Sequence, residues 1–219
     1  AISAILGMLC ENGQEIVAHH ILYGCTYSLV THWLPRYGIQ SKFVDFCNEE
    51  ELRRAITFKT RVLYFETPVN PDLRLIDIAA VRRVVDEINQ DRPPEKQIKI
   101  VVDNTFATPY CQRPIAWGAD FSVHSLTKDI GGFGTDMGGA VIGPRKFYGP
   151  LMLYRKDFGG VLSPKSAWNF LVYGLPTLSA RMINQQKTAH KVARFLQEHP
   201  KVARVFYPGL ESHPQFDLA

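Results

Sequence analysis

Short apolar runs alternate along the chain with longer stretches in which apolar residues recur every three or four positions. The runs predict strands at residues 15–19, 42–46, 61–66, 98–103, 120–125 and 138–143. The helical patterns between them cover residues 26–37, 48–57 and 77–90. Strands rich in Val and Ile on both faces, joined by helices, are typical of a mostly parallel sheet that helices cover on both sides. We therefore predict an α/β fold.

The pattern becomes mostly helical in the last third of the chain. It predicts helices at residues 163–174 and 178–199 and a strand at residues 202–207. We expect a large α/β domain, and then a linking helix with the start of a smaller C-terminal α/β domain, at residues 1–176 and 177–219. The large domain is expected to be truncated at its N-terminus, because the chain opens on a helical pattern without an initiator Met, and only the start of the small domain is expected within these residues.

The composition of the 219 residues excludes several classes of protein. Hydrophobic residues make up 46% and charged residues 21%, which is ordinary for a globular protein in solution. The net charge of +4 comes from scattered basic residues, so no nucleic-acid partner is indicated. No apolar run approaches the roughly 20 residues that cross a bilayer, so no membrane partner is expected.

Cysteine and histidine usage gives no sign of a metal site. The four cysteines lie far apart without a CxxC pair, and no signal peptide is visible. We therefore expect free thiols in a reducing cytoplasm instead of a zinc site or a disulfide framework. His19 and His20 are adjacent, but no third ligand follows at a metal-binding spacing, so both are expected to be structural.

Polar and reactive side chains stand where the predicted strands end. They are Tyr23 and Cys25 after the first strand, Glu66 and Asn70 at the third, Asp103 at the fourth, and Ser125, Thr127 and Lys128 at the fifth. The carboxyl ends of parallel strands lie along one edge of a sheet, which is where open α/β sheets bind ligands. We therefore expect these side chains to line a single edge.

Asp103 and Lys128 are 25 residues apart, which is enough for a turn, a crossover and one more strand. A lysine amine can form a Schiff base, a carboxylate can keep a pyridinium nitrogen protonated, and hydroxyl groups can hold a phosphate. The combination indicates a site for pyridoxal phosphate.

Each of these residues also has a structural interpretation when it is taken alone. Lys128 is then a surface lysine, Asp103 a helix cap, Tyr23 a half-buried aromatic residue and Asn70 a turn residue. A Rossmann-type nucleotide site is not indicated, because no GxGxxG follows the first strand. The joint placement at one edge favours the cofactor site.

Seven segments resemble the Cys/Met-metabolism (trans-sulfuration) family of pyridoxal phosphate enzymes, and within it the methionine γ-lyases. They run in the family's order through the whole chain: LYGCT, THWLPRYGI, YFETPVNP, VVDNTFATPYCQRPIAWGAD, VHSLTK, LSPKSAWNFLVYGLPTLSARM and YPGLESHPQ. The resemblance implies the aspartate-aminotransferase type of fold (fold type I), with a large cofactor domain before a small C-terminal domain.

The resemblance also implies a role for each candidate residue. Lys128 would carry pyridoxal 5'-phosphate as a covalent aldimine. The other cofactor contacts would come from Asp103 at the pyridine nitrogen, Ser125 and Thr127 at the phosphate, Tyr23 on the ring, Asn70 near the phenolic oxygen and Glu66 in support. Tyr23 would also exchange a proton with the leaving group. Cys25 matches the cysteine of methionine γ-lyases, where most relatives have Gly.

Two residues near the lysine depart from the family pattern. Asp129 stands where the family usually has an aromatic residue, and Phe133 stands where it usually has His. The family's remaining site residues, some of them lent by a neighbouring subunit, would lie outside these 219 residues. The resemblance therefore implies a homo-oligomer, a tetramer built from dimers that share active sites.

The reaction implied is γ-elimination of a sulfur amino acid, L-methionine, to methanethiol, 2-oxobutyrate and ammonia. The alternatives keep the cofactor and change the chemistry: cystathionine γ-lyase, cystathionine γ-synthase or O-acetylhomoserine sulfhydrylase. A further alternative is an inactive, truncated α/β module.

Overall fold

The computed structural model describes residues 1–219, and its centre is a six-stranded sheet with the order β2-β1-β3-β4-β5-β6. The strands are β1 (Glu15–His19), β2 (Gln40–Val44), β3 (Thr60–Glu66), β4 (Lys99–Asp103), β5 (Phe121–Ser125) and β6 (Gly139–Ile142). The six strands predicted between residues 15 and 143 are confirmed to within two residues at each end. The first five strands pair in parallel, and the edge strand β6 runs antiparallel to β5. The sheet is therefore mostly parallel, as predicted, but not entirely so.

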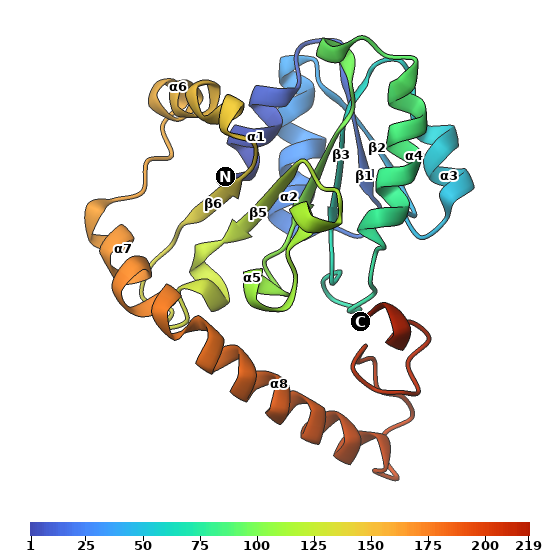
Figure 1. Cartoon of the computed structure of the whole chain (residues 1–219), viewed down its shortest axis with the longest axis vertical. Helices are drawn as coiled ribbons and strands as arrows, with labels where there is room; N and C mark the ends of the chain where they lie inside the picture. The colour runs from blue at the N-terminus through green and yellow to red at the C-terminus, as the bar shows by residue number, and fades with distance from the viewer.

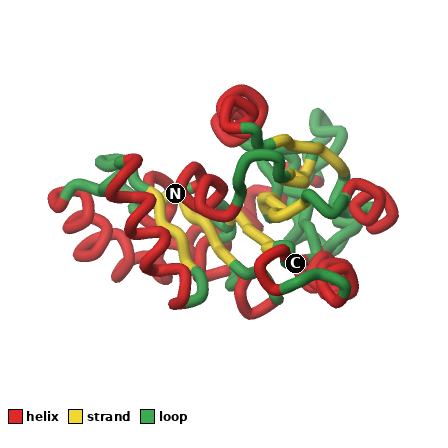
Figure 2. The backbone as a smooth tube through the Cα atoms, turned by 90° about the horizontal axis from the view of Figure 1, so that it is seen from above, coloured by secondary structure: helices red, strands yellow, loops and turns green.

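Helices lie on both sides of the sheet (Figures 1 and 2). One side carries α3 (Glu49–Ala55) and α4 (Ile78–Gln90), and the other carries α1 (Ile2–Leu9), the π-type turn η1 (Leu29–Trp33) and the 3₁₀ turn η2 (Leu34–Tyr37). The remaining helices and helical turns are α2 (Gly24–Ser28), η3 (Pro94–Lys96), α5 (Thr108–Cys111), η4 (Pro114–Trp117), η5 (Leu126–Ile130), η6 (Arg145–Phe147), α6 (Tyr148–Phe158), α7 (Pro164–Asn169), η7 (Phe170–Gly174), α8 (Leu175–Gln197) and η8 (Phe216–Leu218).

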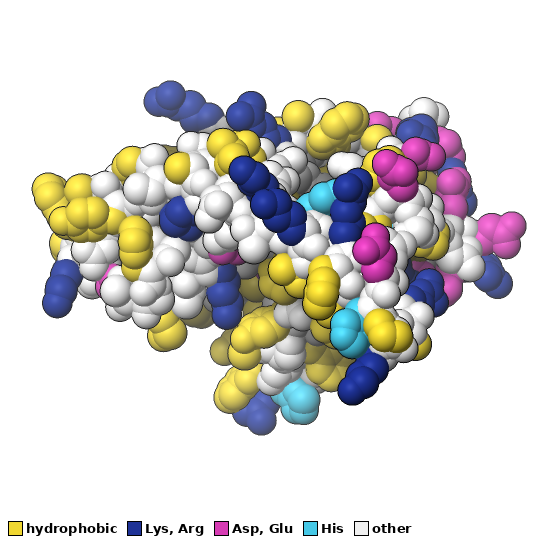
Figure 3. Space-filling model, turned by 90° about the horizontal axis from the view of Figure 1, so that it is seen from below, with side chains coloured by type: hydrophobic (Ala, Val, Ile, Leu, Met, Phe, Trp, Pro, Cys, Tyr) yellow, Lys and Arg dark blue, Asp and Glu magenta, His cyan; other side chains and the backbone are white.

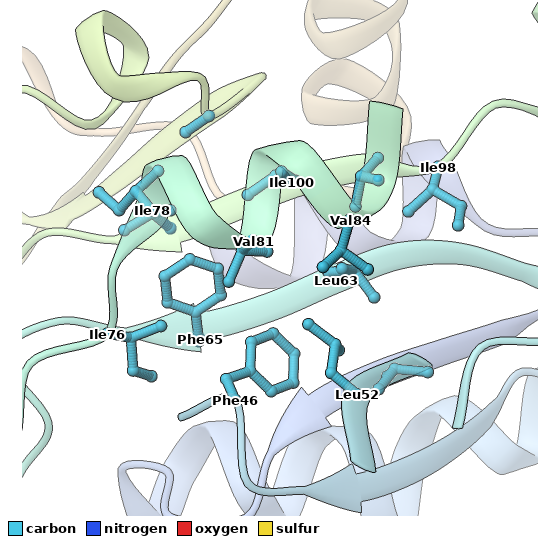
Figure 4. Packing of buried hydrophobic residues seen from close by; sticks show 14 of the residues in the cluster. Phe46, Leu52, Leu63, Phe65, Ile76, Ile78, Val81, Val84, Ile98 and Ile100 are labelled. Atoms are coloured by element: carbon cyan, nitrogen blue, oxygen red, sulfur yellow. The ribbon is translucent and has the colours of Figure 1, made fainter. Parts of the chain in front are cut away.

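Two hydrophobic clusters hold these layers together, one on each face of the sheet. Successive side chains of a strand point to opposite faces, so β3 gives Leu63 and Phe65 to the cluster under α3 and α4, which Figure 4 shows. Val62 and Tyr64 join the cluster on the other face. Burial of one such large apolar side chain is worth about 1.5–3 kcal/mol. The sheet therefore holds the strand ends rigidly in place.

Helix α4 shows how the sequence sets one of these elements. Asp77 begins it, because its carboxylate accepts the backbone N–H of Ala80 at 3.0 Å. Ile78, Val81 and Val85 recur at helical spacing and are buried against the sheet. The helix predicted at residues 77–90 is therefore confirmed.

Two sequence predictions differ from the structure, and one helix was not predicted. Residues 26–37 do not form one helix but pass through α2, η1 and η2, and Pro35 lies in the last of these turns. Residues 202–207 are not a strand, because no strand lies beside them to pair with their backbone groups. Helix α6 was not predicted; none of its residues is buried, so the chain has no clear apolar stripe there.

Helix α8 follows α7 and the turn η7, and it runs below the carboxyl ends of the strands (Figure 1). The chain after it returns toward the loop that follows β3, where the side chain of Gln215 bonds both backbone groups of Leu75, at 2.9 and 2.7 Å. The predicted domain boundary at residues 176–177 falls in the first turn of α8, and the division into two domains stays a prediction. No helix of the structure is long and apolar enough to span a membrane.

Candidate functional site

Three of the predicted site residues lie on one face of the sheet at the carboxyl ends of neighbouring strands. Glu66 ends β3 and is paired in register with Asp103, which ends β4. Asp103 is paired in turn with Val123 of β5, two residues before Ser125. Because alternate residues of a strand share a face, Glu66, Asp103 and Ser125 lie on the same side of the sheet. The structure therefore brings these three together as the sequence predicted.

The carboxylate of Asp103 is oriented by three donors. Its Oδ1 atom accepts the Thr105 hydroxyl at 2.6 Å and the Thr105 backbone N–H at 3.0 Å, and its Oδ2 atom accepts the Tyr64 hydroxyl at 3.2 Å. The Thr105 hydroxyl also accepts the backbone N–H of Ser125 at 2.9 Å. Thr105 thus joins the ends of β4 and β5. Sequence reasoning gave it no role, although a hydroxyl residue two positions after an Asp at a strand end is a signal for such a turn.

Lys128 lies in the turn η5, directly after β5. Its backbone departs from helical geometry, with φ −91° and ψ −135°, and its side chain is exposed. β6 fixes the start of this turn: the Leu126 N–H donates to Gly138 O at 2.9 Å, and the Thr127 hydroxyl accepts the Gly138 N–H at 3.1 Å. The Lys128 amine itself makes no hydrogen bond or ion pair. A fixed turn therefore presents a free amine at the edge of the sheet.

Tyr23 is tied to the same edge through its backbone. Its N–H donates to Glu66 Oε1 at 2.7 Å, and the residue is 47% exposed at the start of α2. Burial, helped by the charge of Asp103 and opposed by the hydrogen bond from the N–H of Tyr23, raises the pKa of Glu66 to about 7. Burial also raises the pKa of the Tyr64 phenol, with Asp103 adding to the effect, so the phenol stays protonated and donates to that carboxylate.

Asn70 and Cys25 lie at the margins of this group. Asn70 is half-buried in the loop after β3, and its backbone N–H works against the rise in the pKa of Glu66. Cys25 is exposed in the first turn of α2, two residues after Tyr23. Asn70 thus stands on a loop and Cys25 on a helix beside the predicted site, and neither side chain makes a hydrogen bond.

A buried network that sequence reasoning missed supports the loop after β4. The Asn104 side chain is fully buried, donates to the carbonyl of Gln112 at 2.8 Å and accepts from the Gln112 amide at 2.8 Å. The same amide donates to the carbonyl of Thr67 at 2.9 Å. This network links the ends of β3 and β4 beneath Asp103. Because Gln112 is eight residues further along the chain, strand patterns gave no sign of the contact.

The structure supplies the third group that the sequence did not reveal beside His19 and His20. Possible ligand atoms of these residues and of Asp45 lie within 4.8 Å of one another. His19 ends β1, and His20 and Asp45 directly follow β1 and β2. The Asp45 carboxylate, however, pairs with Arg74 at 3.1 Å, and His19 Nδ1 accepts the N–H of Phe46 at 3.2 Å. Burial lowers the pKa of His19 to about 4, so the ring is neutral. Internal partners therefore already engage two of the three groups.

The donor set at the strand ends fits pyridoxal phosphate. Lys128 offers an unpaired amine, Asp103 an oriented carboxylate, and Ser125 a half-buried hydroxyl without a hydrogen-bond partner. The Thr127 hydroxyl already bonds the backbone N–H and carbonyl of Gly138. It could contact a phosphate only while it stays in the turn that these bonds hold. An amine, an acid and hydroxyls on adjacent strand ends are what an aldehyde, a pyridine nitrogen and a phosphate require.

The sequence profile of the Cys/Met metabolism PLP-dependent enzymes matches residues 1–219. The chain belongs to this family. Its relatives include the L-methionine gamma-lyase of Fusobacterium nucleatum subsp. polymorphum, 41% identical over all of this chain and 54% of that protein. The cystathionine gamma-lyase of Bacillus subtilis is 39% identical over all of this chain and 55% of that protein.

A solved structure supports the fold of this family member. The cystathionine gamma-lyase of Lactobacillus plantarum, solved with L-serine, aligns with a TM-score of 0.91 and 30% identity over all of this chain and 56% of that one. The family's cofactor is pyridoxal phosphate, as predicted, and the fold is of the predicted type. The chain spans about half the length of the relatives it matches.

Proposed function

We propose that the protein containing this chain is a pyridoxal-phosphate-dependent carbon–sulfur lyase that eliminates the γ-substituent of L-methionine. The observation that carries the proposal is the free Lys128 amine on a fixed turn, one strand away from an Asp103 carboxylate that three hydrogen bonds orient. When bound, the cofactor takes up the negative charge that develops on the substrate carbon.

In this proposal the residues of the chain hold the cofactor and move protons. Asp103 keeps the pyridine nitrogen protonated, and Ser125 and Thr127 donate to the phosphate. The Lys128 amine would take a proton from Cα of the substrate, pass it to the bound cofactor, and then be free to take a second proton from Cβ. The Tyr23 hydroxyl gives a proton to the departing sulfur, and the bond from its N–H to Glu66 fixes where its ring stands.

Two remaining candidates complete the proposed site. Asn70 contacts the cofactor's phenolic oxygen, and its half-buried place in the loop beside Glu66 supports this role. Cys25 faces the substrate, and its exposed place two residues after Tyr23 supports that role. Cys25 also favours methionine as the substrate, because the resemblance to methionine γ-lyases rests in part on this cysteine.

Cystathionine is the second candidate substrate. The two relatives described above are named for different substrates, methionine and cystathionine, and their sequences are almost equally similar to this chain. Purified full-length protein should release methanethiol from L-methionine faster than it releases 2-oxobutyrate from cystathionine. Cys25→Gly should narrow this preference without loss of bound cofactor. Activity on cystathionine alone would overturn the methionine assignment. The absence of any bound cofactor would favour the inactive module.

We also propose that the protein is a cytoplasmic homo-oligomer, a tetramer built from dimers. Viewed from below, hydrophobic side chains gather at the end of the molecule where α7 lies (Figure 3). Val161, Trp168 and Leu171 in this region are each at least 60% exposed, which is unusual for a surface that faces water alone. The four cysteines are free thiols, as in proteins of a reducing compartment. Light scattering of the full-length protein measures the assembly.

A further inference from the structure

Arg181 of α8 reaches the turn that carries Lys128. Its Nη1 donates to the carbonyl of Asp129 at 2.6 Å, and its Nη2 donates to the carbonyls of Gly174 at 2.9 Å and Ile130 at 3.4 Å. One guanidinium therefore joins the end of η5 to the junction of η7 and α8. The planar fork of Arg can bond several carbonyls at once, which the single ammonium of Lys cannot do in the same geometry.

The turn is shaped to admit this guanidinium. Gly132 has φ +79°, and a Cβ at this position would collide with the Arg181 side chain. A Cβ at Gly174 would collide with the carbonyl of Ile130, so η5 and η7 meet backbone to backbone. Two glycines thus let Arg181 come within hydrogen-bond distance of carbonyls one and two residues after Lys128.

The two residues that depart from the family pattern meet the same stretch of α8. The Arg181 guanidinium lies 5.8 Å from the centre of the Phe133 ring, within the range of a cation–π contact. Gln185, one turn further along α8, donates to the Asp129 carboxylate at 3.4 Å. The side chains at these positions therefore add contacts with α8 to the bonds that Arg181 makes with the backbone.

We propose that Arg181 is a positioning residue for Lys128: it anchors the lysine turn to α8 and so holds the amine in place for the cofactor. The inference rests on the proposed function, in which Lys128 binds pyridoxal phosphate. Arg181 acts through the backbone of residues 129 and 130 and does not itself meet the reacting atoms.

The test compares Arg181→Lys with wild type in the full-length protein. The first readout is amide exchange in the cofactor-free protein at Gly131 and Gly132, whose N–H groups bond the carbonyls of Leu126 and Lys128 at 2.9 and 2.8 Å. We expect exchange at these two amides to rise roughly 10-fold to 100-fold, the effect of losing one hydrogen bond of a charged group.

The second readout is pyridoxal phosphate binding to the cofactor-free protein, followed by absorbance near about 420 nm and by circular dichroism of the bound chromophore. We expect about tenfold weaker binding and a smaller dichroic signal per bound cofactor in Arg181→Lys. A purely structural role for Arg181 would not change the dichroism of cofactor that is bound.

Arg92→Lys is the matched control, because the Arg92 guanidinium also bonds several backbone carbonyls, including those of Thr60 at 2.8 Å and Lys96 at 3.3 Å. These bonds lie at the opposite, amino end of β3. Arg92→Lys should lower the melting temperature without changing either readout.

The inference is overturned if Arg181→Lys has the same amide exchange and the same dichroism as wild type. It is also overturned if Arg92→Lys changes these two quantities as much as Arg181→Lys does. If wild-type protein takes up no cofactor at Lys128, the proposed function falls and the inference falls with it. If wild type binds at Lys128 and Arg181→Lys behaves identically, only the role of Arg181 is wrong.

Discussion

Replacing Thr105 by Val tests whether its hydroxyl joins the two strand ends that carry the site. The substitution keeps the branched shape and removes two hydrogen bonds, to Asp103 Oδ1 at 2.6 Å and from the Ser125 N–H at 2.9 Å. The Thr105 backbone N–H and the Tyr64 hydroxyl still reach Asp103. The change is therefore confined to the link between β4 and β5.

The two lost bonds set the expected size of the effect. A hydrogen bond to a charged group is worth about 1.5–3 kcal/mol, and a buried N–H left without a partner costs about 1–3 kcal/mol. Thr105, Asp103 and Ser125 are all half-buried, so water replaces part of each interaction. We therefore expect the free energy of unfolding to fall by about 2 kcal/mol, toward the lower end of these ranges.

Urea denaturation of Thr105→Val, Thr105→Ser and wild type measures this difference. Thr105→Ser keeps the hydroxyl and should stay within about 0.5 kcal/mol of wild type, as ordinary substitutions away from such features do. Pyridoxal phosphate should bind about tenfold more weakly to Thr105→Val, because Asp103 loses one of its orienting donors. If Thr105→Val unfolds with the free energy of wild type, the hydroxyl is not the link that the structure indicates.

Two further predictions concern Glu66 and Asp77. Burial raises the pKa of folded Glu66 from 4.5 to about 7, so the folded state holds an extra proton in this window and loses stability as the pH rises through it. Glu66→Gln keeps an acceptor for the Tyr23 N–H but cannot titrate. Its free energy of unfolding should therefore rise relative to that of wild type by about 2–3 kcal/mol as the pH goes from 4.5 to 8. If the difference in the free energy of unfolding between the two proteins is the same at every pH, the raised pKa of Glu66 is wrong. Asp77→Ala removes the bond that caps α4 at Ala80 and should lower the free energy of unfolding by about 1 kcal/mol, while Asp77→Asn should restore most of it.

The strands and the edge of the sheet could be predicted because their signals are local. A run such as residues 98–103 is apolar enough to be buried on both faces, and the polar residue that ends it marks the edge. Asp103 and Glu66 are thus found by position alone, before any contact is known. The antiparallel direction of β6 has no comparable signal, since direction depends on how the chain between residues 125 and 139 turns back.

The rest of the site depends on contacts between distant segments. Arg181 is 53 positions after Lys128 in the sequence, and nothing in the helical pattern of α8 marks one arginine of its surface as bonded to the lysine turn. Residues 202–207 show the reverse error: a short apolar run predicted a strand, but a strand forms only where a neighbour takes up its backbone hydrogen bonds.

The most direct test of the account is to locate the lysine that binds the cofactor. Full-length protein is loaded with pyridoxal phosphate, reduced with borohydride and digested, and the modified peptide is identified by mass spectrometry. We expect a pyridoxyl group on Lys128 alone, and no modification or absorbance near about 420 nm in Lys128→Ala. Modification of another lysine, or an unchanged absorbance band in Lys128→Ala, would contradict the account.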